Sequence, residues 1–318
     1  MKLLVRRQGV HGYDASEYAE VLRDRLPNHE VVHAPTRETE EREVGDADVL
    51  TGFDVDRELL AAGERLRLFA CAFAGTDHLP LSAFEERGIG VTNAAGVHAP
   101  NVSEYVLGAL LGHARQFREG YRRQERCEWR PWTVRELAGS TATVVGLGHI
   151  GRAVTERLAA FDVETVGIRA SPQKGGPADE VIGPDQLHDA LSRSTAVILA
   201  CPLTDETRGL VGQPEFTTMP ADAILINVAR GPVVDTEALV AALRADRIGG
   251  ATLDVTDPEP LPPDHPLWTF ENVQVTPHNA GNTPVYYKRL ADIVAENIKR
   301  VDESGWDTTL RNVVLSPA

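Results

Sequence analysis

Lysine is scarce in this sequence, and acidic residues outnumber basic ones. Four of the 32 basic residues are lysines, at positions 2, 174, 288 and 299, and 47 acidic residues give the 318-residue chain a formal net charge of −15. This surplus of negative charge argues against nucleic acid and anionic membranes as partners, because both attract basic proteins. Excess carboxylate with so little lysine resembles proteins of salt-accumulating archaea, and an acidic protein from a GC-rich genome is the alternative.

Cysteine is also rare, and long apolar runs are missing. Cys71, Cys127 and Cys201 include no CxxC pair, and the ten histidines show no metal-ligand spacing. We therefore predict neither a disulfide framework nor a metal site. No apolar run approaches the ~18 residues of a membrane helix, and the apolar stretch at the start is too short for a signal peptide. We expect a protein of the cytoplasm that contacts no membrane.

What the sequence does contain is an alternation of short apolar runs with amphipathic stretches, typical of βαβ units on parallel sheets. The length allows two domains. The first series predicts helices at 16–26 and 56–62, and strands at Leu3–Val5, Glu30–His33, Asp48–Leu50 and Leu66–Ala72. A long apolar helix is expected over Val102–Phe117, with Asn101 as its N-cap.

A second series follows the long helix. It predicts helices at 150–160 and 235–243, the latter with Asp235 as N-cap. Its strands are expected at Thr141–Val145, Thr165–Ile168, Ala196–Ala200, Ala223–Val228, Ala251–Val255 and Val273–Thr276. An amphipathic helix over Pro284–Val301 ends the pattern and is expected to fold back on the first series.

A Gly-x-Gly-x-x-Gly motif joins a strand to a helix in this second series. Gly146 permits the tight turn, Gly148 lets a pyrophosphate approach the backbone, and Gly151 lets helix and strand pack closely. With His149 and Ile150, these glycines would place the phosphates at the positive end of the helix. The motif in this context predicts dinucleotide binding.

The residue after the next strand indicates which dinucleotide. An NAD site usually has an acidic residue there that binds the ribose 2′-hydroxyl. This chain has Arg169, with Ser171 and Lys174 close by. An arginine attracts the 2′-phosphate of NADP, so we predict NADP(H) as the preferred cofactor, with NAD(H) as the alternative.

Three ionisable residues follow three further strands of the second series. Arg230, Glu259 and His278 each come just after a predicted strand. Ligands of open parallel sheets bind beyond the carboxyl ends of the strands, so residues distant in sequence can meet there. We expect these three side chains to form one catalytic group beside the dinucleotide.

The segments around these residues resemble the D-isomer-specific 2-hydroxyacid dehydrogenase family. The resemblance rests on NAAG (93–96), VSE (102–104), PLTDETRG (202–209), INVARGPVVD (226–235), LDVTDPEPL (253–261) and TPHNAG (276–281). It implies two Rossmann- or flavodoxin-like doubly wound domains, with a dinucleotide-binding domain (101–282) inserted into a substrate domain (1–100 and 283–318). It also implies an NAD(P)-dependent oxidoreductase that acts on D-2-hydroxy acids, and a homodimer built around the cofactor domain.

The resemblance also implies roles for single residues. Arg230 would hold the carboxylate and carbonyl oxygen of a 2-oxo acid with its planar guanidinium. His278 would donate the proton, with Glu259 orienting its imidazole and stabilising its charged form. Asp254 would accept from the nicotinamide carboxamide, and backbone N–H groups at Ala74 and Gly75 would face the substrate carboxylate. Further cofactor contacts are expected at Pro202, Thr207 and Val228.

The chain departs from the family pattern at few positions. Ser103 stands where alanine is usual in the family, and Thr256-Asp257 stands where Phe-Glu is common. Arg169 stands where many members have an aspartate. Glu259 argues against a formate-dehydrogenase type, in which glutamine pairs with the histidine. Phosphoglycerate and phosphite dehydrogenases remain alternatives, as does a nucleotide-sensing corepressor that binds peptides on the same scaffold.

Overall fold

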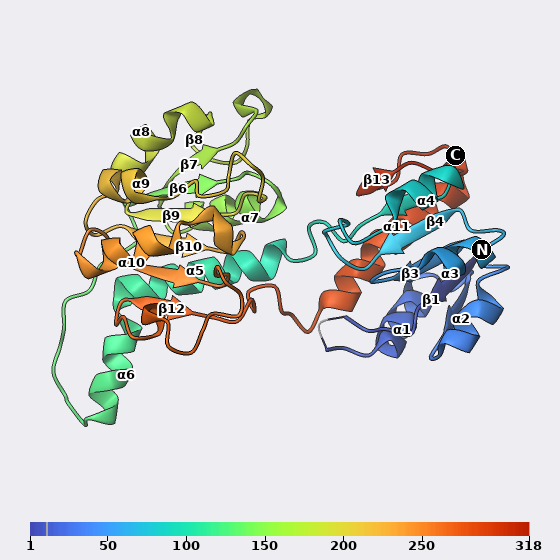
Figure 1. Ribbon diagram of the computed structural model, residues 1–318, viewed down its shortest axis with the longest axis horizontal. Coiled ribbons are helices and arrows are strands. Elements are labelled where there is room, and N and C mark those ends of the chain that lie inside the picture. Colours follow the sequence, from blue (N-terminus) through green and yellow to red (C-terminus); the bar gives the residue numbers. More distant parts are fainter. Residues whose placement is uncertain (11, 318) are drawn as a thin grey trace. The chain divides into compact units, whose positions relative to one another are not determined.

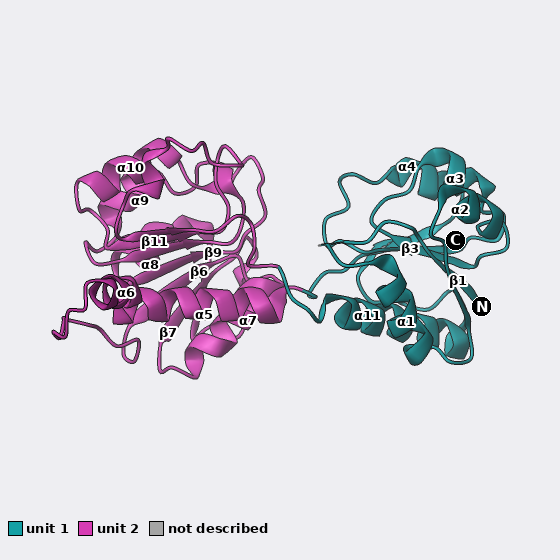
Figure 2. Cartoon of the chain, turned by 90° about the horizontal axis from the view of Figure 1, so that it is seen from below, with its two compact units in different colours: residues 1–97, 282–318 teal, residues 98–281 magenta. Residues whose placement is uncertain are grey.

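Each predicted series of strands forms its own sheet in the computed structural model, which describes residues 1–10 and 12–317. Unit 1 comprises Met1–Val97 and Asn282–Ala318, and unit 2 comprises His98–Gly281 (Figure 2). In both units, helices cover the two faces of a mainly or wholly parallel sheet (Figure 1). The prediction of two doubly wound α/β folds is therefore confirmed.

The sheet of unit 1 has the order β13-β5-β4-β3-β1-β2, and only β13 is antiparallel to its neighbour. Its strands are β1 (Lys2–Val5), β2 (Glu30–His33), β3 (Val49–Gly52), β4 (Leu68–Cys71), β5 (Gly90–Thr92) and β13 (Val313–Leu315). Helices α1 (Ala15–Arg25) and α11 (Tyr286–Ser304) share one apolar core with the sheet, and α3 (Arg57–Ala62) and α4 (Leu81–Glu86) contribute to a second. Helix α2 (Arg37–Glu43) buries only Glu40. The predicted C-terminal helix thus packs on the first series, as expected.

The sheet of unit 2 is wholly parallel, in the order β12-β11-β10-β9-β6-β7-β8. Its strands are β6 (Thr141–Val145), β7 (Glu164–Ile168), β8 (Glu180–Ile182), β9 (Ala196–Leu199), β10 (Ile224–Asn227), β11 (Gly250–Leu253) and β12 (Val273–Val275). Helices α5 (Ala99–Arg115) and α7 (His149–Ala159) pack in one core, and α8 (Leu187–Ser192), α9 (Gln213–Thr218) and α10 (Thr236–Arg244) in another. This topology brings the carboxyl ends of the strands to one edge.

The start of α5 differs from the prediction. The helix begins at Ala99 with His98 as its N-cap, so Asn101 is not the cap residue. Pro100 stands in the first turn, where a missing N–H costs nothing and the fixed φ favours a helix. Asn101 instead donates its side-chain amide to the carbonyl oxygen of Ala280 at 2.8 Å. The predicted cap of α10 is correct, because Asp235 accepts from the N–H of Ala238.

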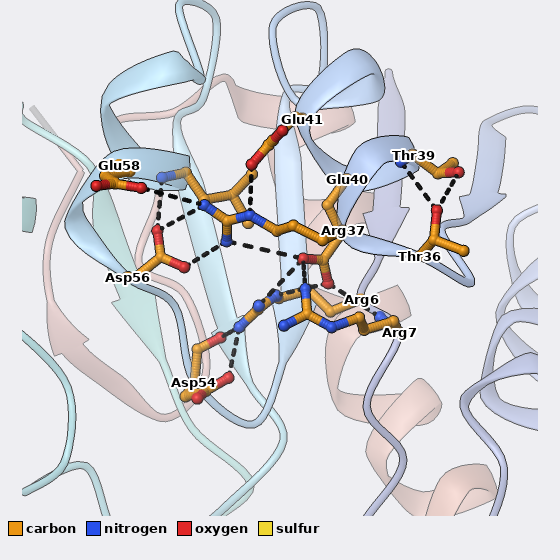
Figure 3. Close-up of polar contacts among 11 residues, drawn as sticks. Arg6, Arg7, Thr36, Arg37, Thr39, Glu40, Glu41, Asp54, Asp56 and Glu58 are labelled. Atoms are coloured by element: carbon orange, nitrogen blue, oxygen red, sulfur yellow. Dashed lines mark hydrogen bonds and ion pairs between the residues drawn. The ribbon is translucent and has the colours of Figure 1, made fainter.

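Unit 1 also contains a cluster of buried charge (Figure 3). Arg6, 3% exposed, follows β1 and donates through Nε and Nη2 to the carboxylate of Glu40, which is fully buried in α2. The backbone N–H and the guanidinium of Arg7 bind the same carboxylate. This ion pair, rather than an apolar stripe, fastens α2 to the sheet.

Within the described ranges, no helix combines the length and the apolar character that crossing a bilayer requires.

Candidate active site

The glycine motif forms the turn between β6 and α7. Gly146 has a φ of +98°, and a Cβ on Gly151 would lie 1.8 Å from the carbonyl oxygen of Gly146. Both positions therefore require glycine, the first for its backbone conformation and the second for close packing. Gly148 caps α7, and apart from its two chain neighbours no atom of the described residues lies within 4 Å of a Cβ built there. The helix start, formed by His149 and Ile150, is thus open to a phosphate group.

Arg169 and Ser171 lie in the loop that follows β7. Arg169 is half-buried, and its Nη1 donates to the carbonyl oxygen of Gly175 at 2.6 Å. Ser171 precedes a short 3₁₀ turn and accepts from the N–H of Lys174. One nitrogen of the Arg169 guanidinium therefore stabilises this loop. The other N–H groups of the guanidinium have no partner among the described residues.

Two neighbours shape the turn that presents Arg230 after β10. Asn227 is buried, donates to the carbonyl oxygen of Arg230 at 3.0 Å and accepts from the N–H of Ala229 at 3.0 Å. A Cβ on Gly231 would lie 1.9 Å from the carbonyl oxygen of Thr256, so the turn packs against the loop after β11. The side chain of Arg230 is exposed at this strand end.

Glu259 and His278 meet beyond β11 and β12. Nδ1 of His278 lies 2.7 Å from Oε1 of Glu259, and the two side chains are 51% and 43% exposed. Because an ionised carboxylate only accepts, Nδ1 is the donor. Nε2 has no partner among the described residues and is the nitrogen left for a substrate. Sequence and structure therefore agree that these two residues form a pair.

The carboxylate of Asp254 holds the loop that carries His278. It is 3% exposed, and it accepts from the hydroxyl of Thr276 at 2.6 Å and from the N–H groups of Asn279 at 2.8 Å and Ala280 at 2.9 Å. These contacts give Asp254 a structural role, the stabilisation of this loop, that its sequence motif did not indicate. They depend on where the chain returns after β12, which the sequence alone does not show.

The remaining predicted residues also follow strands. Pro202 and Thr207 share the loop after β9, where the Thr207 hydroxyl donates to the Pro202 carbonyl at 2.7 Å. Val228 directly follows β10. Ala74 and Gly75 are exposed after β4 and belong to unit 1. Unit 2 therefore carries every predicted cofactor and catalytic residue, and unit 1 carries the predicted carboxylate loop.

These features define a dinucleotide-binding Rossmann-type unit with an arginine, a glutamate and a histidine at its strand ends. The chain belongs to the D-isomer specific 2-hydroxyacid dehydrogenase family, because residues 107–280 match the family model described as its NAD binding domain. The predicted family and the oxidoreductase class are thereby confirmed.

Three similar proteins illustrate the resemblance to the family. A glyoxylate reductase of Thermofilum pendens is 37% identical over 276 residues, covering 83% of this chain and 81% of that protein. A D-3-phosphoglycerate dehydrogenase of Methanocaldococcus jannaschii is 35% identical over 278 residues, and this chain matches only 53% of its length. A solved D-isomer specific 2-hydroxyacid dehydrogenase of Xanthobacter autotrophicus Py2, in complex with NADPH and MES, has a TM-score of 0.78 at 29% identity, covering 98% of this chain and 97% of that one.

Proposed function

We propose that this protein reduces a small 2-oxo acid to the D-2-hydroxy acid with NADPH, using Arg230, Glu259 and His278. The observation that carries the proposal is the 2.7 Å bond between Nδ1 of His278 and Glu259, which leaves Nε2 for the substrate. NADPH, when bound at the glycine turn, would supply the hydride for the carbonyl carbon. His278 donates a proton from Nε2 to the carbonyl oxygen, so that this oxygen becomes a neutral hydroxyl group in place of an alkoxide.

The other two residues prepare this proton transfer. Arg230 is permanently charged and planar, which suits a carboxylate and an adjacent carbonyl oxygen. Glu259 fixes the ring of His278 and stabilises the imidazolium that reduction requires. In the reverse direction the neutral imidazole accepts the hydroxyl proton instead.

The relatives support a small 2-oxo acid as the substrate class. Glyoxylate reductases are among them, and a phosphoglycerate dehydrogenase is similar over 86% of this chain. We expect glyoxylate, hydroxypyruvate or pyruvate to be reduced, and we expect activity to hold at high salt because of the charge of −15. Rates with these acids, NADPH or NADH, and low or high KCl test both points. Cofactor binding without turnover of any acid would favour a sensor protein and overturn the proposal.

Cofactor preference is proposed to depend on Arg169. Arg169→Asp should lower the ratio of kcat/KM for NADPH to that for NADH about tenfold or more, equivalent to about 1.4 kcal/mol, since the new carboxylate repels a 2′-phosphate. Arg244→Asp, an exposed position on α10, is the matched control and should leave the ratio unchanged. An unchanged ratio in Arg169→Asp would show that this residue does not bind the phosphate.

We further propose that unit 2 forms a homodimer through α6 and the segment after it. Within its described range, Phe117–Glu125, this helix buries no residue, and Figure 1 shows that it extends away from the sheet. Tyr121 is 65% exposed and lines an open groove of about 880 Å³, and Trp129, in the segment after α6, is fully exposed. Exposed aromatic patches of this kind mark interfaces, and twofold symmetry lets each projecting segment fill the groove of the other copy.

The mass in solution tests the homodimer. Light scattering should give about twice 34.6 kDa for the natural chain. Trp129→Asp should shift the mass toward one copy, because a charge would be placed in an apolar contact. A single-copy mass for the natural chain would contradict the homodimer.

A further inference from the structure

A chain of three side chains leads from helix α5 to the loop of His278. The hydroxyl of Tyr105 lies 2.6 Å from Oγ1 of Thr276, which lies 2.6 Å from Oδ1 of Asp254. The carboxylate only accepts, so Thr276 gives its one hydroxyl proton to Asp254. Tyr105 must therefore donate to Thr276, and the direction of both bonds is fixed.

The surroundings keep Tyr105 protonated, so the direction of these hydrogen bonds does not change. Asp254 is 3% exposed and Tyr105 is half-buried. Burial raises the pKa of Tyr105 to about 12, the charge of Asp254 adds to the rise, and the bond to Thr276 opposes it. Tyr105 therefore stays protonated and remains a donor at neutral pH. Buried polar groups with satisfied partners of this kind specify one local conformation.

The loop that these bonds hold has an unusual backbone. His278 has a φ of +51°, in the left-handed region that non-glycine residues rarely occupy. Such a conformation persists only where its surroundings enforce it. Asp254 binds Thr276 on one side of His278 and the N–H groups of Asn279 and Ala280 on the other. The bonds thus fix the chain directly before and after His278.

We propose that Tyr105 is a positioning residue, which through Thr276 and Asp254 fixes the backbone of His278 and so directs its imidazole. The inference rests on the proposed function, since it requires His278 to be the proton donor. Tyr105 itself is assigned no contact with substrate or cofactor. Its loss should therefore lower kcat and leave the Kd for NADPH unchanged.

Four variants of the 318-residue chain test this role. Tyr105→Phe removes the hydroxyl alone and should lower kcat about tenfold, since small displacements of a reacting group cost this much or more. Thr276→Val should lower kcat at least as much, and Thr276→Ser, which keeps a hydroxyl, should restore it. Because Tyr105 acts only through Thr276, the double variant Tyr105→Phe/Thr276→Val should be no slower than Thr276→Val alone.

The outcomes separate this inference from the proposed function. A natural chain that reduces no 2-oxo acid overturns both. A natural chain that is active, with a Tyr105→Phe variant of unchanged kcat, overturns the role of Tyr105 alone. Losses that multiply in the double variant, or an equal loss in Thr276→Ser and Thr276→Val, also overturn it.

Discussion

Glu40 in unit 1 and Glu259 in unit 2 both bind a basic side chain, but their surroundings differ. Glu40 is fully buried, and the backbone N–H of Arg7 and the Nε and Nη2 of Arg6 all donate to it (Figure 3). Glu259 is 43% exposed and binds His278 through one oxygen. The carboxylate of Glu40 is saturated by hydrogen-bond donors, whereas that of Glu259 can accept further hydrogen bonds.

The two partners differ as well. Arginine stays charged at any accessible pH, so the Arg6–Glu40 pair cannot exchange a proton with a ligand. Histidine changes charge near neutrality, and Nε2 of the exposed His278 ring has no partner among the described residues, which is why we propose it as the proton donor. The comparison shows that burial and saturation indicate a structural ion pair. Exposure together with a titratable partner is what an ion pair needs in order to exchange a proton with a ligand, as we propose for Glu259 and His278.

The comparison is tested most strongly by removing the charge of Glu259. Glu259→Gln keeps the shape of the side chain but no longer stabilises the imidazolium, so kcat for reduction should fall about 10²-fold. The unfolding free energy should change by no more than about 0.5 kcal/mol, as for an exposed site. Steady-state rates and urea unfolding measure both quantities.

Asp264→Asn, which alters an exposed acid of the same loop, is the control and should match the natural chain. An equal loss of activity in both variants would remove the special role of Glu259.

The same change in the buried cluster should have the opposite result. Glu40→Gln removes the one fully buried counter-charge of Arg6 and leaves only its ion pair with the exposed Asp54. We expect this to cost about 3–5 kcal/mol of unfolding free energy. Activity per folded molecule should be retained. Glu41→Gln, on the same helix, disrupts an exposed pair with Arg37 and should cost less than about 1 kcal/mol. Equal costs for the two variants would refute the structural reading of the buried cluster.

A smaller effect on the unfolding free energy is expected from His113, a half-buried group whose hydrogen-bond partner is uncharged. Burial lowers the pKa of His113 from 6.5 to about 4, and its Nε2 lies 2.9 Å from Oγ1 of Thr252. Between these two pH values the unfolded chain binds a proton that the folded chain does not. The unfolding free energy should therefore fall as pH drops from 6.5 toward 4, by up to about 3 kcal/mol.

Urea unfolding of the natural chain and of His113→Gln at several pH values isolates this contribution. The pH-dependent part should shrink in the variant, because no group at position 113 then titrates. Parallel curves for the two proteins would contradict a neutral His113.

Some parts of the fold and of the candidate site could be predicted from the sequence. Strands such as Glu30–His33 and Thr141–Val145 match β2 and β6, because apolar runs directly reflect burial in a sheet. The glycine motif and the strand-end position of Arg230 follow from local pattern and parallel topology. These parts of the site depend on order along the chain.

Other parts depend on contacts distant in sequence. Helix α2 was not predicted, because six of its seven residues are charged and its one buried residue is Glu40. The Asn101 cap was wrong because the helix starts earlier, at Pro100 and Ala99. The bonds of Asp254 to Thr276 and of Thr276 to Tyr105 join residues up to 171 positions apart. No periodicity in the sequence reports such contacts.

The central claim, that His278 supplies the proton at a site built by unit 2, is tested most directly by His278→Ala. Its rate of 2-oxo acid reduction and its Kd for NADPH should be measured side by side with those of the natural chain. We expect kcat to fall about 10²–10⁴-fold while NADPH binds with unchanged affinity. Reduction at the natural rate without the imidazole would contradict the account.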